Sequence, residues 1–353
     1  MPSSAIEPMN SLTRPPRFHR LAIADVRQET ADAVSIAFAV PPPLAGEYRF
    51  SPGQYLTLRA TLEGEEVRRS YSLCSAPDDP APRIAVKRVA GGLFSTWLCA
   101  AARPGLELDV MTPTGRFGLA GAPGDGRVHV AFAAGSGITP VLSILRGVLA
   151  GEPRSRFFLF YGNRSTDGII FRHVLSREEQ DVPVLNGRLD ADKARLLLRT
   201  LVPAAAVDHA FVCGPEEMLA TLPATLAELG LPPAAIHVER FVSARGGRPR
   251  PAPPVAPDAP PAHVASLIVD GKRRDVPVAA GEAILDAALR AGMDLPFACK
   301  GGMCSTCRAR LLEGTAEMAL NYALEPWELA AGYVLTCQAR PTSPRVVVDY
   351  DHV

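Results

Sequence analysis

Four cysteines near the carboxyl end of the chain have a spacing that could hold an iron–sulfur centre. Cys299, Cys304 and Cys307 form a C-x4-C-x2-C run, and Cys337 follows after 29 intervening residues. This is the plant-type spacing of the thiolate ligands of a [2Fe–2S] cluster. Because such a cluster exchanges one electron at a time, the spacing predicts a one-electron centre.

A zinc site and disulfide bonds are the alternatives for the same cysteines. A zinc ribbon needs a second C-x2-C pair or two histidines, whereas the partner of this run is the single Cys337. The loop also contains Gly301 and Gly302, which let the backbone fold tightly around sulfide ions and direct N–H groups at them. The sequence therefore favours a [2Fe–2S] cluster bound by the four cysteines.

The composition of the 353-residue chain is that of a soluble globular protein of two or three domains, with 47% hydrophobic and 21% charged residues. The 37 basic and 37 acidic residues cancel, which argues against nucleic acid or an anionic membrane as the main partner. Residues 1–20 are rich in Ser and Pro and lack the apolar run of a secretory signal, so we expect a cytoplasmic location. In that reducing compartment we expect Cys74, Cys99 and Cys213 to be free thiols.

One apolar stretch imitates a membrane span. Residues 128–151 are mostly apolar, but Gly135, Gly137 and Pro140 interrupt them and Arg146 lies inside. We interpret the stretch as a buried strand followed by a helix, and we expect no membrane association.

Changes of pattern along the chain predict a multidomain protein with three folded parts. Residues 17–123 alternate with period two and are punctuated by Pro and Gly, which predicts an antiparallel β-barrel. Residues 124–243 alternate strands with helices, which predicts an α/β domain with a parallel sheet. The Pro-rich residues 244–263 are typical of a semi-extended linker. Residues 264–353 predict a small mixed sheet packed by one helix, with a hairpin at Asp270-Gly271.

Residues suited to flavin chemistry end one of the predicted barrel strands, in the run Arg69-Ser-Tyr-Ser72. Arg69 has forked donors that can neutralise a pyrophosphate, Tyr71 can lie against an isoalloxazine ring, and Ser72 can reach flavin N5. The alternative is an edge strand with a solvated arginine. The R-x-Y-S pattern resembles the flavin-binding signature of the ferredoxin–NADP reductase family.

Two later segments strengthen this resemblance. Residues 86–95 and 113–117 are similar, in the same order, to the second and third flavin segments of the family. In the first of them Gly91 and Gly92 precede a helix whose N-terminus, with Ser95, is expected to hold phosphate oxygens. The resemblance implies that FAD is bound by Arg69, Tyr71, Ser72, Val86, Lys87, Gly92 and Ser95.

A glycine loop, Gly135-Ser-Gly137, joins the buried strand to the helix after it. We expect Thr139 to cap that helix and Pro140 to lie in its first turn. Free N–H groups at such a helix start attract phosphate, and a plain glycine turn between strand and helix is the alternative. The family resemblance makes this loop, with Gly135, Gly137 and Thr139, the binding loop for the nicotinamide dinucleotide.

A later strand ends in Cys213-Gly-Pro215, which the resemblance makes the companion motif of that loop. In the family its cysteine and glycine approach the nicotinamide, which implies these roles for Cys213 and Gly214, with Pro215 beside them. A core cysteine before a turn is the alternative.

The adenosine ribose is expected after the second strand of the parallel sheet, where Arg164 and Ser165 would meet a 2′-phosphate. These residues favour NADPH over NADH, although a loop arginine is usually solvated and Asp167 is close enough to pair with it. Phe241 is expected to cover the flavin, as carboxyl-terminal aromatic residues of the family do.

From about residue 18 to residue 351 the order of modules is similar to that of class IA-like oxygenase reductases, whose carboxyl-terminal ferredoxin has the α+β β-grasp fold. The similarity to members that serve di-iron oxygenases extends to Arg49–Gln54, Tyr161–Arg164, Ala298–Gly302 and Asn321–Leu335. The resemblance implies electron flow from NADPH through FAD and the cluster to the oxygenase component of a multicomponent monooxygenase. It implies catalytic roles for Tyr71, Ser72 and Cys213.

The chain departs from this family between Ile169 and Arg188. The family has a full helix and a further parallel strand there, and residues 164–171 are too few for the crossover that a parallel neighbour needs. We therefore expect this strand to be missing or replaced, so that the α/β domain is shortened and NADPH affinity or domain stability is reduced. The alternative functions are a reductase of another oxygenase, and an electron-carrier or assembly subunit with an impaired nicotinamide domain.

Overall fold

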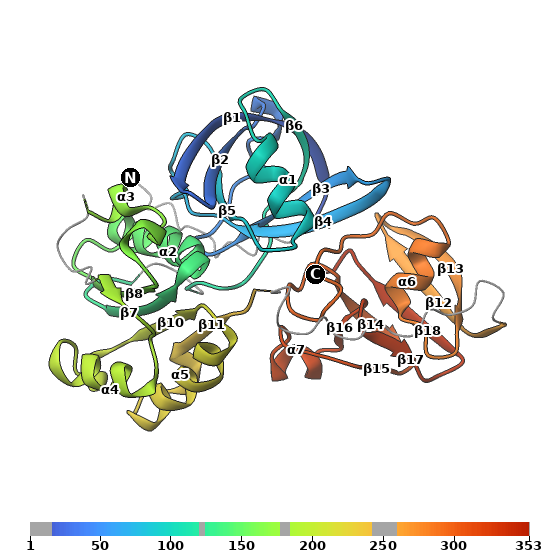
Figure 1. Ribbon diagram of the computed structural model, residues 1–353. Helices are drawn as coiled ribbons and strands as arrows, with labels where there is room; N and C mark the ends of the chain where they lie inside the picture. Colours follow the sequence, from blue (N-terminus) through green and yellow to red (C-terminus); the bar gives the residue numbers. More distant parts are fainter. Residues whose placement is uncertain (1–15, 120–123, 177–183, 242–259, 353) are drawn as a thin grey trace, which may run out of the picture. The chain divides into compact units, whose positions relative to one another are not determined.

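The computed structural model describes residues 16–119, 124–176, 184–241 and 260–352 (Figure 1). They form two compact units, the first made mainly of the described residues up to Phe241 and the second mainly of those from 260 onwards. No described helix is both long and apolar enough to cross a membrane. Residues 128–151 form a strand and a helix, as predicted.

The amino-terminal part of the first unit is a six-stranded sheet in the order β4-β3-β6-β1-β2-β5. The pairs β1–β2, β2–β5 and β3–β6 are antiparallel, and the sheet curls around an apolar core (Figure 1). The predicted antiparallel fold is confirmed. The elements are β1 Phe18–Thr30, β2 Ala33–Ala39, η1 Pro42–Leu44, β3 Tyr55–Leu62, β4 Glu65–Ser72, β5 Arg83–Lys87, α1 Leu93–Ala101 and β6 Glu107–Met111.

The rest of the first unit is a parallel five-stranded sheet in the order β11-β10-β7-β8-β9, as the alternation of strands and helices predicted. Its strands are β7 Val128–Ala134, β8 Arg156–Asn163, β9 Val184–Asn186, β10 His209–Cys213 and β11 Ile236–Glu239. The α-helices are α2 Ile138–Gly151, α3 Arg172–Leu175, α4 Ala191–Thr200 and α5 Glu216–Glu228. The short 3-10 helices are η2 Gly135–Gly137, η3 Thr166–Gly168, η4 Ala204–Ala206 and η5 Pro233–Ala235.

Helices cover both faces of this parallel sheet. Leu142 and Leu145 of α2 pack on one face, in a core that also contains Phe117 of the barrel part. Leu222 of α5 and Leu198 of α4 pack on the other face. Because one core spans both sheets of the first unit, the barrel part and the parallel sheet are held as one body.

The expectation of a missing strand is wrong. β9 pairs in parallel with β8, with Val184 opposite Tyr161. The crossover runs from Asn163 to Val184 and includes η3 and α3, so it is long enough for a parallel connection. In the part of the chain that the structure describes, the strand has three residues and α3 has four. Residues 177–183 of the crossover lie outside the described residues.

The expected role of Thr139 as a helix cap is also wrong. η2 continues directly into α2, so the α-helix begins at Ile138 and Thr139 lies within its first turn. The Thr139 hydroxyl donates a hydrogen bond to the carbonyl of Ser136 at 2.9 Å. The glycine loop is itself helical, which moves the start of the helix towards the amino terminus.

The second unit contains the predicted mixed sheet, in the order β13-β12-β18-β14-β16. The pair β12–β18 is parallel and the other pairs are antiparallel. The predicted hairpin turn is confirmed: Asp270 and Gly271 have φ of 51° and 70°, as a type I′ turn requires. The elements are β12 Pro261–Val269, β13 Lys272–Ala279, α6 Ile284–Arg290, β14 Arg308–Glu313, β15 Ala316–Met318, α7 Pro326–Ala330, β16 Tyr333–Leu335, β17 Ala339–Pro341 and β18 Arg345–Asp349.

The predicted linker, residues 244–263, falls largely outside the described residues. Its last residues are described, and there β12 begins at Pro261. The proposed limits of the linker and of the three domains stay predictions.

Candidate functional site

The cysteine loop between α6 and β14 is tightly folded. Lys300, Gly302 and Ser305 have positive φ angles of 51°, 74° and 53°. A Cβ on Gly302 would lie 2.9 Å from the carbonyl oxygen of Leu320, so the loop needs glycine there for space as well as for its φ angle. The two non-glycine residues in the left-handed region are strained, which is common at ligand-binding loops.

Hydrogen-bond donors of this loop point at sulfur, as the glycines predicted. The N–H of Gly301 donates to Cys299 Sγ at 3.2 Å, and the N–H of Cys299 approaches Cys304 Sγ at 3.5 Å. The hydroxyl of Thr306 donates to Cys304 Sγ at 3.3 Å. Such donors stabilise negative charge on sulfur and thereby influence the reduction potential of an iron–sulfur centre.

The four thiols form two pairs, Cys299 with Cys304 and Cys307 with Cys337. The hydrogen bond from Cys304, helped by backbone N–H groups, lowers the pKa of Cys299, and the bond from Cys307 lowers the pKa of Cys337. Within the described ranges, no three His, Cys, Asp or Glu side chains gather closely enough to hold one metal ion. Two thiol pairs suit the two irons of a [2Fe–2S] cluster, whereas zinc needs four ligands around one point.

Tyr71 and Ser72 end β4 beside α1. The ring of Tyr71 is partly buried, with its centroid 6.1 Å from that of Phe94 in α1. Ser72 is buried, and Val86 of β5 is completely buried in the core that contains Phe94. Arg69 differs, because its side chain is exposed and its guanidinium donates to the carbonyl of the preceding residue at 2.7 Å.

The helix start predicted for phosphate oxygens is present. α1 begins at Leu93, directly after Gly92, and the Ser95 hydroxyl accepts a hydrogen bond from the N–H of Val89 at 3.1 Å. Lys87 lies at the end of β5, with its ammonium 3.6 Å from the carboxylate of Asp32. A helix start of this kind suits a phosphate group.

The third segment that resembles flavin-binding sequence, residues 113–117, contains an unpaired polar atom. The hydroxyl of Thr114 is buried and has no hydrogen-bond partner within the described residues. Next to it Gly115 has φ of 115°, and a Cβ there would lie 2.8 Å from the ring of Tyr55. A buried hydroxyl without a partner is unfavourable, so this segment fits a polar ligand lying against it.

The two predicted nicotinamide motifs are in direct contact. A Cβ on Gly137 would lie 2.1 Å from the carbonyl oxygen of Cys213, so only glycine allows this approach. Gly135 has φ of 56° and open space at its Cβ position, and its carbonyl accepts from the hydroxyl of Tyr161 at 2.8 Å. Both motifs lie at the carboxyl edge of the parallel sheet, where open α/β sheets bind their ligands.

The residues after Cys213 continue this close packing. A Cβ on Gly214 would lie 2.4 Å from Cε of Met218, and Pro215 precedes the first residue of α5. Phe241 is partly buried against the core that contains Cys213. The structure thus brings Cys213 and Phe241 to one region of the first unit.

The predicted ribose end lies after β8. Arg164 and Ser165 are exposed there, next to the buried Asn163, whose side-chain nitrogen has no hydrogen-bond partner in the described part of the chain. The N–H of Gly187 donates to the carbonyl of Asn163 at 2.9 Å. A Cβ on Gly187 would lie 3.7 Å from Nζ of Lys193, so a second cation stands near this edge.

Three family models match consecutive parts of the chain. An oxidoreductase FAD-binding domain matches residues 21–118, an oxidoreductase NAD-binding domain residues 132–222, and a 2Fe-2S iron-sulfur cluster binding domain residues 267–342. The chain is 45% identical to one of the subunits of 1,2-phenylacetyl-CoA epoxidase from Escherichia coli (strain K12), over 95% of this chain and 98% of that protein. The chain belongs to the flavin and iron–sulfur reductases of multicomponent oxygenases.

Other members of this reductase family act with different oxygenases. The chain is 36% identical to the ferredoxin reductase component of 3-ketosteroid-9-alpha-monooxygenase from Mycobacterium tuberculosis (strain ATCC 25618 / H37Rv), over 94% of this chain and 95% of that protein. The structure resembles phthalate dioxygenase reductase with a TM-score of 0.59 and 27% identity, covering 94% of this chain and 98% of that chain. The reductase therefore carries FAD and a [2Fe–2S] cluster and takes electrons from NAD(P)H.

The sequence interpretation of the reductase missed Glu239. This residue pairs in register with Cys213 on the neighbouring strand, and its charge contributes to the raised pKa of the Cys213 thiol, which is caused mainly by burial. Desolvation raises the pKa of the Glu239 carboxyl to about 8, although the side chain keeps a small exposed surface. A lone glutamate in a short apolar strand was the available signal. The contact of Tyr161 with the glycine loop could not be predicted either, because an aromatic residue in a buried strand is expected to be a core residue.

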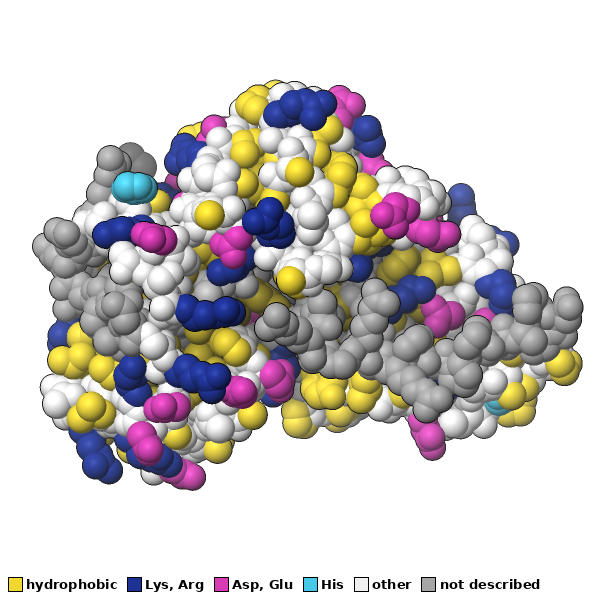
Figure 2. Space-filling model, viewed as in Figure 1, with side chains coloured by type: hydrophobic (Ala, Val, Ile, Leu, Met, Phe, Trp, Pro, Cys, Tyr) yellow, Lys and Arg dark blue, Asp and Glu magenta, His cyan; other side chains and the backbone are white. Residues whose placement is uncertain are grey.

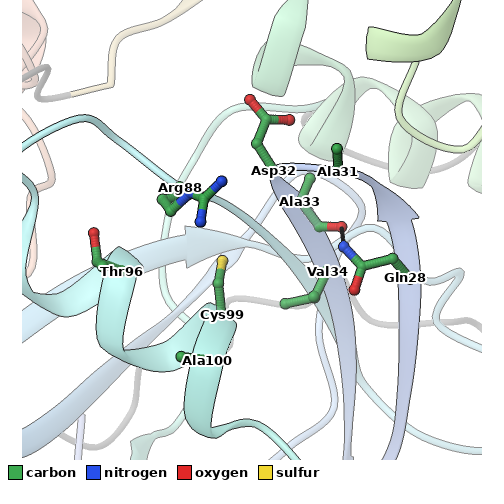
Figure 3. A pocket seen from close by; sticks show the side chains of 9 residues that line it. All are labelled: Gln28, Ala31, Asp32, Ala33, Val34, Arg88, Thr96, Cys99 and Ala100. Atoms are coloured by element: carbon green, nitrogen blue, oxygen red, sulfur yellow. Dashed lines mark hydrogen bonds between the residues drawn. The ribbon is translucent and has the colours of Figure 1, made fainter.

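A pocket of about 190 Å³ opens in the barrel part of the reductase, and its lining residue Asp32 is the carboxylate that pairs with Lys87. Its lining comes from the β1–β2 turn, α1 and the residue after β5 (Figure 3). Asp32, Arg88 and Cys99 are its chemically reactive side chains, and burial raises the pKa of the Cys99 thiol. None of the predicted cofactor residues lines this pocket, so it adds nothing to the flavin site.

Proposed function

We propose that the chain carries electrons from NADPH through FAD and its [2Fe–2S] cluster to the di-iron oxygenase of a phenylacetyl-CoA epoxidase, in phenylacetate degradation. The observation that carries the proposal is the 45% identity to a subunit of the Escherichia coli epoxidase over nearly the whole of both chains. The proposed location is the cytoplasm, and the proposed acceptor is a protein, without nucleic acid or membrane. The proposed domains are residues 17–123, 124–243 and 264–353, joined by linker residues 244–263.

When bound, the nicotinamide supplies a hydride, the flavin converts that electron pair into single electrons, and the cluster carries one electron at a time. The side chains of the first unit are proposed to position the flavin for these exchanges. Tyr71 is proposed to lie against the flavin ring and Ser72 to hydrogen-bond flavin N5, while Phe241 covers the ring. Arg69, Lys87, Gly92 and Ser95 are proposed to hold the phosphates.

The nicotinamide is proposed to bind where Gly137 and Cys213 touch. Their close packing gives a rigid surface for the ring, and the Tyr161 hydroxyl holds the carbonyl of Gly135, which keeps the loop open to the dinucleotide. Glu239 lies beside Cys213 and stays largely protonated at neutral pH because its pKa is raised to about 8. A neutral carboxyl there avoids placing a fixed charge beside the reacting rings.

The dinucleotide is proposed to be NADPH. Arg164 and Ser165 supply a cation and a hydroxyl after β8, and Lys193 adds a positive charge beside Gly187.

To test this, kcat/KM would be measured with NADPH and NADH for wild type and Arg164→Ala. We expect kcat/KM of the variant to fall at least tenfold with NADPH and to change little with NADH. A tenfold fall corresponds to about 1.4 kcal/mol of 2′-phosphate recognition. Arg199→Ala, an exposed arginine at the end of α4, is the matched control. An equal loss with both dinucleotides would contradict the proposal.

The test of the overall function has two stages. Anaerobic titration with NADPH should bleach first flavin and then cluster absorption in the purified chain. The chain should then restore epoxidation of phenylacetyl-CoA to the Escherichia coli epoxidase assembled without its own homologue of this chain. Bleaching without epoxidation would identify a reductase of another oxygenase, as in the relatives that serve other substrates.

A second candidate function is an electron carrier or assembly subunit with an impaired nicotinamide domain. The three-residue β9 and the four-residue α3 favour it, because they make the ribose edge of the sheet small. Its signature is a flavin that is reduced by light in the presence of a sacrificial donor but is not bleached by NADPH. Normal NADPH turnover, with a single thermal transition of the first unit, would exclude it.

A further inference from the structure

The helix α7 of the second unit has its charged residue inside and its apolar residues outside. Glu328 is 0% exposed, whereas Trp327 is 56% and Leu329 44% exposed. Tyr322, four residues before α7, is 55% exposed. Figure 2 shows hydrophobic side chains on the surface where α7 lies. We call the exposed side chains of Tyr322, Trp327 and Leu329 the 322–329 surface.

This inverted pattern is fixed by the interior of the domain. The buried carboxylate of Glu328 pairs with Arg308, and the guanidinium of Arg308 also lies over the ring of Tyr333, 4.3 Å from its centroid. A buried charge pair of this kind is costly to break, because either partner alone would be left unpaired inside the protein. The helix therefore cannot rotate to bury Trp327 and Leu329, and these side chains remain at the surface.

The Trp327 side chain is held in one orientation. Its indole Nε1 donates to the carboxylate of Glu325 at 2.7 Å. Glu325 and Glu328 also form a capping box, in which each side chain accepts from the other residue's backbone N–H. An aromatic side chain that is fixed before binding loses little entropy in a complex, and tryptophan and tyrosine are enriched among residues that dominate interface energies.

The 322–329 surface is tied directly to the cluster loop at two points. The N–H of Tyr322 donates to the carbonyl of Gly302 at 3.0 Å, within the loop that holds Cys299 and Cys304. Arg308, the partner of Glu328, is the residue after Cys307. Electron transfer slows steeply with distance, so a protein acceptor has to bind close to the cluster. The 322–329 surface is thus connected to the ligand loop through the backbone of Tyr322 and through the buried Glu328–Arg308 pair.

We propose that the 322–329 surface is where the oxygenase component docks to receive electrons, with Trp327 as the main anchor. This rests on the proposed function, which makes the cluster the last carrier in the chain and an oxygenase its acceptor. The partner surface expected from the chemistry is an apolar pocket that takes the indole ring, with a polar rim.

The experiment uses the full-length reductase and three variants, Trp327→Ala, Tyr322→Ala and Leu196→Ala. Leu196 lies on α4 in the first unit and is 61% exposed, so its variant is the matched control for loss of a surface apolar side chain. Three quantities are measured: epoxidation by the Escherichia coli epoxidase lacking its homologue of this chain, as a function of reductase concentration; ferricyanide reduction; and the rate at which NADPH bleaches the cluster.

We expect Trp327→Ala to raise the reductase concentration for half-maximal epoxidation about thirtyfold, equivalent to about 2 kcal/mol. Tyr322→Ala should give a smaller rise in the same direction, and Leu196→Ala no change. Ferricyanide reduction and cluster bleaching should be unchanged in all three, because the substitutions lie outside the cofactor sites.

When wild type supports epoxidation, three results would overturn the proposal. Unchanged epoxidation by Trp327→Ala would show that the surface takes no part in docking. Slower cluster bleaching would show that it faces the flavin part of the chain instead. A dimer that dissociates in Trp327→Ala, measured by sedimentation, would show that a second copy covers it. Absence of epoxidation with wild type, despite normal cluster bleaching, would instead refute the proposed partner and this inference with it.

Discussion

The contact between Gly137 and Cys213 joins the two proposed nicotinamide motifs of the reductase. A Cβ on Gly137 would lie 2.1 Å from the carbonyl oxygen of Cys213 and 2.5 Å from its carbonyl carbon. No rotamer can relieve such an overlap with backbone, so the glycine loop after β7 and the end of β10 are matched in shape. Two segments almost eighty residues apart thus define one surface.

We expect Gly137→Ala to force these segments apart. NADPH-dependent ferricyanide reduction should fall at least tenfold in kcat/KM, or about 1.4 kcal/mol, while FAD content and photoreduction of the flavin stay normal. Gly46→Ala is the control, because nothing lies within 4 Å of that Cβ position and its φ angle needs no glycine. Full activity of Gly137→Ala would show that the close approach is unimportant for the dinucleotide.

The pKa of Glu239 predicts how stability depends on pH. Burial raises this carboxyl from 4.5 to about 8, so the folded chain binds a proton here that the unfolded chain releases. The contribution of Glu239 to stability is therefore present at low pH and is lost as pH rises through about 8. At pH 8.5 we expect Glu239→Gln to be more stable than wild type by several kcal/mol, at most about 5 kcal/mol, in urea unfolding of the first unit.

The same substitution separates stability from catalysis. At pH 5 the difference in the free energy of unfolding should shrink to below about 1 kcal/mol, because Glu239 is neutral in the folded chain and the unfolded carboxyl, with a pKa of 4.5, has only begun to ionise. If the hydride exchange needs an ionisable group at this position, Glu239→Gln should also flatten the pH profile of kcat with NADPH between pH 7 and 9. A stability difference that is the same at pH 5 and pH 8.5 would contradict the raised pKa.

The pairing of Cys307 with Cys337 predicts which cofactor is lost when one thiol is removed. Serine is a poor ligand for iron in a cluster, so Cys337→Ser should lose iron and acid-labile sulfide but retain FAD. Ferricyanide can take electrons from the flavin, so its reduction by NADPH should persist, whereas cytochrome c reduction should fall at least tenfold.

The control for this prediction is Cys99→Ser, which changes a thiol of the barrel part and should leave both cofactors in place. Iron and sulfide at wild-type levels in Cys337→Ser would show that another residue ligates the cluster. Such a result would also remove the basis for assigning the two thiol pairs to two irons.

Much of this fold was readable because the signals are local. Period-two alternation predicted the barrel strands. The dipeptide Asp270-Gly271 predicted the hairpin of the second unit, and the cysteine spacing predicted the cluster loop. What the sequence hid depends on tertiary contacts. The sequence does not show where the crossover to β9 ends: residues 164–171 alone are too few, but the chain continues past α3 to Val184 before it pairs with β8. Thr139 lies inside the helix and does not cap it, because a 3-10 turn of glycines and serine extends the helix towards its amino end.

The functional residues that reasoning from sequence missed are those whose role arises from a neighbour on another strand. Glu239 is notable only because β11 places it beside Cys213. The inverted face of α7 could not be read either, since Trp327 and Leu329 predict a buried face until Arg308 is seen to hold Glu328 inside.

A buried histidine at the opposite end of the parallel sheet gives a last prediction. His129 is 0% exposed and stacks on His209, with ring centroids 5.6 Å apart, while its Nε2 lies 3.0 Å from the carboxylate of Glu152. Burial lowers the pKa of His129 despite that carboxylate, and burial together with the charge of His129 lowers the pKa of His209. Folding therefore favours neutral imidazoles, and stability should fall as pH drops below the unfolded value of 6.5.

We expect His129→Phe to reduce this loss of stability. Phenylalanine keeps the stacking with Phe157 and His209 but cannot take up a proton, and Glu152 retains its bonds to Arg127 and Ser155. Between pH 7.5 and pH 5.5 the free energy of unfolding of the first unit, measured in urea, should fall by about 1 kcal/mol less in His129→Phe than in wild type. Part of the pH dependence of stability should remain in this variant, because the pKa of His209 is also lowered in the folded chain. An identical pH slope in both proteins would show that folded His129 takes up its proton as readily as the unfolded residue does, with Glu152 compensating the charge.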